Sequence, residues 1–149
     1  MQRRVVAGIA LVALIGGAGL ASGQGSPAEW LKRIFDPASL GLQVFPGAAL
    51  NRKLSTDAIG LQRGGDRRIA IYIIELAQLK AAADHFQQQV GVAPEVTGTE
   101  TQYLAYTFDF TAPGKGPAKL NGLIVQVTRS PFIDGKGQIR MDYQPPATN

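Results

Sequence analysis

The residues that usually perform catalysis or bind metals are scarce in this sequence. It contains one histidine, His85, and no cysteine. A zinc site takes three or four protein ligands, and a serine–histidine–aspartate relay needs a histidine close to its two partners. Asp84 precedes His85, but neighbouring residues on a helix do not face each other. We interpret His85 as a solvated surface residue and predict no catalytic set, no metal site and no cofactor.

The carboxylates do not indicate an acid–base pair either. A glycosidase-like site needs two carboxyl groups that face each other across a cleft, and no spacing in the sequence predicts such a pair. The carboxylates nearest the expected strands are interpreted as outward polar residues, turn residues or helix-start charges: Asp57, Glu75, Asp109 and Asp142. The alternative is an enzyme that uses carboxylates and tyrosines in a cleft, with Asp109, Tyr106 and His85 as its participants.

Two glycine-rich segments lack the residues of ion-binding or phosphate-binding loops. Asp134-Gly135-Lys136-Gly137 is followed by no acid before Asp142, so the ligand set of a calcium loop is missing. Gly114-Lys115-Gly116 lacks the frame of a phosphate-binding loop and a helix start beside it. Both segments are typical of turns.

Basic residues are concentrated in one stretch. Five of them lie within 17 residues that contain only two acids: Arg52, Lys53, Arg63, Arg67 and Arg68. If a hairpin turn gathers Arg63, Arg67 and Arg68, they offer a contact for an unknown protein or an anionic envelope component. The alternative is a set of solvated charges that protects an edge hairpin from aggregation. No aromatic residue is interleaved with these charges, which argues against nucleic-acid binding.

The N-terminus has the features of a secretory signal peptide. Arg3 and Arg4 precede an uncharged apolar run, residues 5–20, and small residues follow. We predict a signal peptide over residues 1–23, with cleavage after Ala21-Ser22-Gly23 or after Gly19-Leu20-Ala21. The alternative is an uncleaved membrane anchor, but the run is shorter than most membrane spans and its four glycines weaken a helix. The expected location is periplasmic or extracellular.

Removal of this leader changes the charge of the chain. The full sequence has 15 basic and 11 acidic residues and a formal charge of +4. Without Arg3 and Arg4, 13 basic residues remain against the same 11 acids, and the formal charge falls to +2. Half of the apparent basicity therefore belongs to the leader.

Residues 24–149 are expected to form a single α+β domain. Ser26-Pro27-Ala28-Glu29 is typical of a capping box and predicts a short helix over residues 26–36. Residues 37–53 are expected to be an extended linker, and residues 144–149 a frayed tail. Periodicity and turn residues predict the order β-β-α-β-β-β, with approximate ranges 54–61, 68–74, 76–90, 102–110, 123–128 and 139–143.

The expected architecture is a two-layer sandwich in which one long helix covers a mostly antiparallel sheet of about five strands. Gly91 is expected to end this helix. In the strand over residues 102–110, alternation places Leu104 and Tyr106 on one side and Tyr103 and Asp109 on the other.

The segment Phe45-Pro46-Gly47-Ala48, followed by an expected hairpin, strand and amphipathic helix, resembles small exported bacterial proteins of unknown function. These carry a Tyr- or Phe-Pro-Gly-Ala element, and the similarity covers residues 42–91. Ile74-Glu75-Leu76 departs from the Thr/Asp/Ser-rich helix start of that family. The resemblance implies a compartment and a fold, and no catalytic residues.

Taken together, the residues favour a small exported non-enzymatic domain that binds a partner through an exposed sheet face or the hairpin. The competing hypotheses are the enzyme described above and a membrane-anchored envelope assembly or stress factor that retains residues 5–20 as its anchor.

Overall fold

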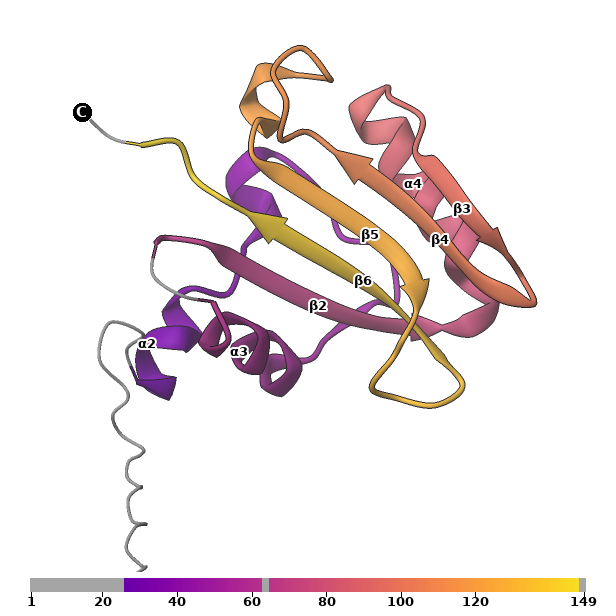
Figure 1. The fold of residues 1–149 in the computed structure, drawn as a ribbon, viewed down its shortest axis with the longest axis horizontal. Helices are drawn as coiled ribbons and strands as arrows, with labels where there is room; N and C mark the ends of the chain where they lie inside the picture. Colours follow the sequence, from indigo (N-terminus) through magenta and orange to yellow (C-terminus); the bar gives the residue numbers. More distant parts are fainter. Residues whose placement is uncertain (1–25, 63–64, 148–149) are drawn as a thin grey trace, which may run out of the picture.

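One sheet organises the chain. A computed structural model describes residues 26–62 and 65–147, and it shows six strands in the order β1-β2-β6-β5-β4-β3, with every neighbouring pair antiparallel (Figure 1). The strands are β1 Ala49–Leu50, β2 Arg68–Glu75, β3 Glu95–Thr99, β4 Gln102–Asp109, β5 Leu123–Arg129 and β6 Lys136–Tyr143. The predicted signal peptide and its cleavage site lie outside the described residues. The α+β class and the antiparallel sheet are confirmed.

The long helix covers one face of the sheet, as expected. Helix α4, Leu79–Val90, follows the short 3-10 helix η2, Leu76–Gln78, and ends at Gly91 in a left-handed conformation. Its buried side chains pack on the apolar rows that the strand register aligns. One such row runs through Tyr72, Ile139, Val127 and Tyr106 on four successive strands. This layer contains most of the buried apolar side chains.

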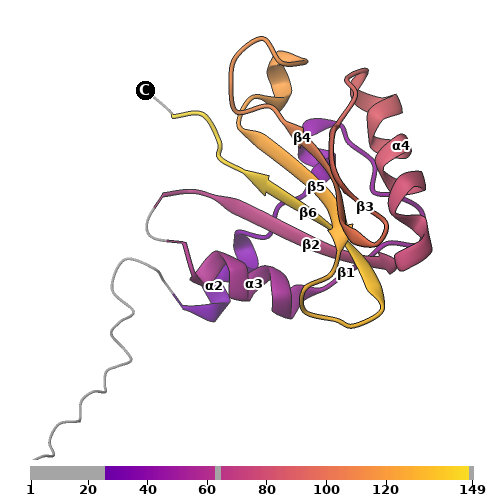
Figure 2. The same ribbon diagram turned by 45° about the vertical axis from the view of Figure 1, so that its right-hand side comes forward.

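A second, smaller apolar layer lies on the opposite face of β2. Ile69, Ile71 and Ile73 alternate with the residues that face α4, and helices α2, Pro27–Lys32, and α3, Arg52–Gly60, pack against them. Figure 2 shows α4 on one side of the sheet and α2 with α3 on the other. The expected two-layer sandwich therefore lacks one feature of the structure: helices α2 and α3 add a partial third layer, which covers β2 on its second face. This double burial explains why its sequence is almost continuously apolar.

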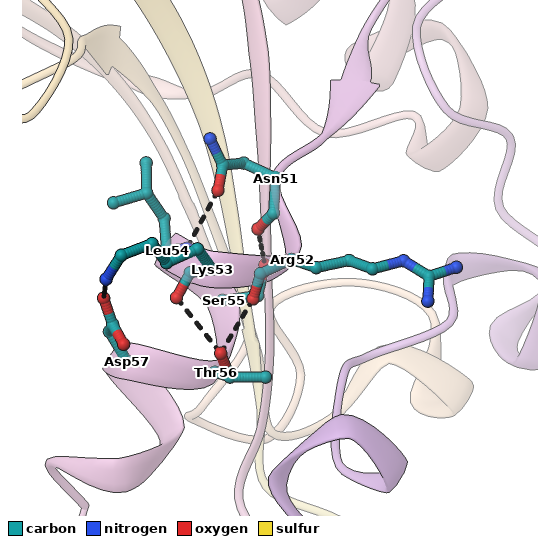
Figure 3. Close-up of polar contacts among 7 residues, drawn as sticks. All are labelled: Asn51, Arg52, Lys53, Leu54, Ser55, Thr56 and Asp57. Atoms are coloured by element: carbon teal, nitrogen blue, oxygen red, sulfur yellow. Dashed lines mark hydrogen bonds and ion pairs between the residues drawn. The ribbon is translucent and has the colours of Figure 1, made fainter. Parts of the chain in front are cut away.

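Helix α3 replaces one of the expected strands. Asn51 caps it by accepting a hydrogen bond from the Leu54 N–H at 2.9 Å, and Lys53 pairs with Asp57 at 2.8 Å one turn later (Figure 3). The expected strand over residues 54–61, and with it the hairpin to residues 68–74, is wrong. The apolar and small residues of this segment recur at helical spacing and bury one helix face against β2: Leu54, Ser55, Ala58 and Ile59.

Two strands, β1 and β3, were not expected, and the first helix and the linker after it differ from their predicted extents. Strand β3 and the two-residue β1 make the sheet six-stranded rather than about five-stranded. The first helix begins at the expected capping box but ends at Lys32, since Asp36 starts a separate 3-10 helix, η1, Pro37–Leu40. The expected linker over residues 37–53 therefore contains η1, β1 and the start of α3.

No helix within residues 26–62 and 65–147 is both long enough and apolar enough to cross a bilayer.

Candidate functional site

A pocket of about 540 Å³ lies where the start of the helical segment meets the β3–β4 hairpin. Leu76, Ala77 and Leu79 form its wall on the helix side, and Leu104 forms part of the wall on the strand side. Its polar lining comes from both sides and from the end of β5: Lys80, Glu100, Tyr103, Tyr106 and Arg129. We call this cavity the Tyr103 pocket.

Tyr103 reaches the pocket because β4 is irregular at this point. Its φ is +57°, and it is the one described residue other than glycine with a positive φ. Thr99 of β3 stands opposite both Gln102 and Tyr103, which is the mark of a bulge. Regular alternation would place Tyr103 on the face opposite Leu104 and Tyr106, as the sequence predicts. The bulge interrupts this alternation at Tyr103, and all three residues line one cavity.

Gly98 makes this irregular backbone possible. Its φ is +76°, and a Cβ at this position would collide with the backbone carbonyl oxygens of Gln102 and Tyr103. Only a glycine therefore allows β3 to approach β4 so closely beside Tyr103. A left-handed conformation costs a bulky residue free energy, and such strain is often found at functional sites.

The two cations of the pocket differ in their partners. Lys80 donates to Asp84 one helical turn away at 2.9 Å, and this hydrogen bond raises the pKa of its ammonium group. Arg129 is exposed at the end of β5 and forms no ion pair with any described residue. Glu100 is exposed in the β3–β4 turn and is likewise unpaired within the described chain.

Tyr106 extends the polar lining toward the helix. It is half-buried, stands opposite Val127 in the sheet, and contributes to the raised pKa of Lys80. The pocket therefore combines an apolar wall with a few polar groups that converge from different elements, which is the usual composition of a small-molecule site.

No family model matches the sequence, and no significant similarity to a curated protein or to a solved structure was found.

The residues proposed for the enzyme alternative do not meet. Tyr106 faces α4, whereas Asp109 follows on the opposite face of β4 and accepts two hydrogen bonds from Thr111, at 2.9 Å from its N–H and 2.5 Å from its hydroxyl. His85 lies further along α4, where its ring packs edge-on against Phe45 with centroids 5.7 Å apart. The nearest polar group is the Gln89 amide nitrogen, 3.3 Å from Nδ1.

His85 is thus less solvated than the sequence analysis expected. It is half-buried under the segment that carries Phe45-Pro46-Gly47-Ala48. Gln89 fixes this segment on α4, because its amide group both donates to the Gln43 carbonyl, at 2.9 Å, and accepts from the Gln43 N–H, at 2.7 Å. The surroundings of His85 are those of a packing residue.

The hairpin that was expected to gather three arginines is replaced by α3, and two of these arginines lie in the described residues. Arg63 lies outside the described residues. Arg67 forms an ion pair with Asp142 at 2.6 Å, and Arg140 lies on the other oxygen of that carboxylate at 3.4 Å. Arg68 begins β2 and is exposed. On the sheet face opposite α4, Arg67 is therefore already engaged by an acid of β6.

The remaining carboxylates singled out in the sequence also have local partners. Glu75 pairs with Lys136 at 2.7 Å and Asp57 with Lys53 at 2.8 Å. Within residues 26–62 and 65–147 no cluster of three or more potential metal ligands occurs. The turn after β5 is held by Ser130, whose hydroxyl accepts from the N–H groups of Phe132 and Ile133.

Sequence reasoning missed most of the pocket. Tyr106 is a candidate in the sequence and Tyr103 is predicted only as a strand residue, whereas Lys80, Glu100 and Arg129 are not candidates. The available signal was Gly98, a glycine four residues after Pro94 that interrupts a polar, strand-like segment. An isolated glycine in such a segment can mark a bulge, and a bulge changes which face the next side chains occupy.

Proposed function

We propose that the protein is an exported, non-enzymatic binding domain whose ligand site is the Tyr103 pocket. The observation that carries this proposal is the bulge at Tyr103. At this bulge Tyr103 has a positive φ, and it lines a cavity of about 540 Å³ together with Leu104 and Tyr106. The volume falls in the range of roughly 300 to 1,000 Å³ that is typical of small-molecule sites.

The chemistry of the lining supports binding over catalysis. A general acid or base usually has a pKa shifted by burial or by a close charge. The acid of the pocket, Glu100, is exposed, and the pKa of Lys80 is raised by its own helix neighbour, which keeps its amine protonated. A protonated ammonium group can hold a ligand but cannot act as a nucleophile or base.

Export is proposed from the N-terminal sequence. The basic start and the uncharged run at residues 5–20 are typical of a signal peptide, and the Phe-Pro-Gly-Ala resemblance implies the same compartment. Mass spectrometry of the protein from fractionated cells tests this point. A mature N-terminus near Gln24 in the soluble fraction supports export, whereas an intact Met1 in the membrane fraction would favour the anchored alternative.

Binding is tested with a small-molecule fragment library and a variant that fills the pocket. Ala77 is an exposed residue of the pocket wall, so Ala77→Trp should block the cavity without disturbing the core. Ala81→Trp, at an exposed position of α4 outside the pocket, is the matched control. Fragments that bind the wild type should lose affinity for Ala77→Trp alone. Equal affinity for both variants, or no binding fragment at all, would contradict the proposal.

A further inference from the structure

We infer that the Tyr103 pocket selects a small carboxylate carried on an apolar body. This inference rests on the proposed function, since it names the class of ligand for the same cavity. It follows from the types of polar group in the lining, from their partners and from the apolar surface between them.

Hydrogen-bond donors dominate the polar lining. Lys80 and Arg129 are donors only, and the hydroxyls of Tyr103 and Tyr106 can donate. Glu100 is the single side chain that only accepts when ionised. A ligand that satisfies most of these groups at once must therefore be rich in acceptors. Lys80 is paired with Asp84, so Arg129 is the cation of the lining that forms no ion pair with a described residue, and it favours a negative charge near its guanidinium.

Arg129 is the residue that should select the anion. It is the last residue of β5, and it lies directly beyond the Ala105–Thr128 pair, on the side of the sheet that faces η2 and α4. Its guanidinium has no ion-pair partner among the described residues, so its paired donors are available. A guanidinium binds a carboxylate through two parallel hydrogen bonds, which gives geometric as well as electrostatic selectivity.

Lys80 and Glu100 refine the selection. Much of the charge of Lys80 is offset by Asp84, with Nζ to carboxylate distances of 2.9 and 3.2 Å. It therefore supplements Arg129 instead of adding a second full charge. Glu100 places one negative charge at the same cavity and opposes a dianion more strongly than a monoanion. A carboxylate is thus favoured over a phosphate monoester.

The apolar wall determines the rest of the ligand. Leu76, Leu79 and Leu104 contribute aliphatic surface from the helix side and the strand side, and Tyr103 also lines the cavity. Contact with this surface stabilises an apolar or aromatic body in proportion to the area that it removes from water. A small inorganic anion would leave that surface exposed.

Three matched probes test the inference by NMR titration of the isotope-labelled protein: phenylacetate, phenylacetamide and phenyl phosphate. Phenylacetate should shift the amide signals of Tyr103, Leu104 and Arg129, and it should bind at least about tenfold more tightly than the neutral amide, because a charge-assisted hydrogen bond is lost with the charge. Phenyl phosphate should bind more weakly than phenylacetate.

Arg129→Gln should abolish the preference for the acid over the amide while the amide still binds. Arg68→Gln is the control. Arg68 is an exposed arginine at the start of β2, in register with the first residue of β5, and so lies at the strand end opposite to Arg129; its substitution should leave the preference unchanged. Circular dichroism and the thermal midpoint verify that both variants fold.

Each outcome separates the inference from the proposed function. Equal binding of phenylacetate and phenylacetamide, or tighter binding of phenyl phosphate, would overturn the carboxylate inference and leave the pocket as a binding site. An unchanged preference in Arg129→Gln would overturn the role of Arg129. If neither these probes nor any library fragment binds, the proposed function itself fails.

Discussion

The hydroxyl of Ser55 accepts a hydrogen bond from the backbone N–H of Ile71 at 2.9 Å. It thereby provides the acceptor that the carbonyl of a neighbouring strand would otherwise supply. The same hydroxyl donates to the Asn51 carbonyl at 2.7 Å, and the Asn51 N–H donates to the Ile71 carbonyl at 2.8 Å. Ser55 is 0% exposed. One turn of α3 therefore satisfies both backbone groups of a residue at the centre of β2.

Ser55→Ala should lower the free energy of unfolding by about 1 to 3 kcal/mol, because the Ile71 N–H loses its partner in a buried position. Urea denaturation measures the change. Thr56→Ala is the matched control, because the Thr56 hydroxyl bonds only carbonyls of its own helix, at 2.9 and 3.1 Å (Figure 3). It should change stability by no more than about 0.5 kcal/mol. Equal effects of the two substitutions would contradict the role assigned to Ser55.

Gly98→Ala should disrupt the bulge that directs Tyr103 into the pocket. The left-handed conformation and the collision with the Gln102 and Tyr103 carbonyls together should cost about 2 to 4 kcal/mol. Gly135 has the same φ of +76° but open space around its Cβ position. Gly135→Ala therefore reports the conformational cost alone, about 1 to 2 kcal/mol. A loss at Gly98 no larger than at Gly135 would show that the close approach of β3 to β4 is unimportant.

Strand β2 and helix α4 were predictable because their burial is recorded in the sequence. The apolar, β-branched residues of β2 are buried on both faces, and the helical spacing of Leu79, Ala83, Phe86 and Val90 matches one buried face of α4. Strong periodicity of this kind reflects the packing of the side chains themselves. Both elements were therefore located within a few residues.

The elements that were missed depend on contacts that periodicity does not report. All five residues of β3 are exposed, so no alternation marks the strand. At the end of α3, Ile59 and its C-cap Leu61 also fit a weak alternation, and the cap formed by Asn51 marks the helix start instead. The pocket was missed for a third reason, since the bulge with a positive φ at Tyr103 interrupts the alternation on which the prediction depends.

Gly60→Ala should destabilise the contact between α2 and α3. Alanine normally favours a helix over glycine by up to about 1 kcal/mol. Here a Cβ would lie 2.8 Å from the Trp30 ring, so the ring must shift, at a cost of about 1 to 3 kcal/mol. With the smaller side chain of Trp30→Leu, the same glycine substitution should become neutral or stabilising. Thermal unfolding of the four proteins tests this reversal of sign, and a constant effect in both backgrounds would refute it.

Stability at low pH should depend in part on Asp109. Hydrogen bonds from the Thr111 hydroxyl and N–H lower the pKa of this carboxyl, and Lys115 adds a smaller effect. Because the folded-state pKa lies below the unfolded value, this contribution is present above about pH 4 and is lost as the pH falls through the folded-state pKa.

NMR titration of the Asp109 carboxyl checks the shift. Thr111→Val removes one donor and should raise the Asp109 pKa toward its ordinary value. Thr97→Val, an exposed substitution on β3, should leave it unchanged. A titration that is identical in Thr111→Val and in the wild type would contradict the assignment.

The two ends of the sheet differ in what they leave open to another chain. At the β2 end, the Ile69 backbone is hydrogen-bonded to Arg33 and Phe35, and the Ile71 backbone to Asn51 and Ser55, and β1 is an edge strand of two residues. At the other end, the five exposed residues of β3 form the margin. If two copies paired edge to edge through β3, the longer edge strand of each copy would be occupied. Association through β3 would then stop at a dimer, because the short β1 edge offers little backbone for a further copy to pair with, and a fibre could not extend.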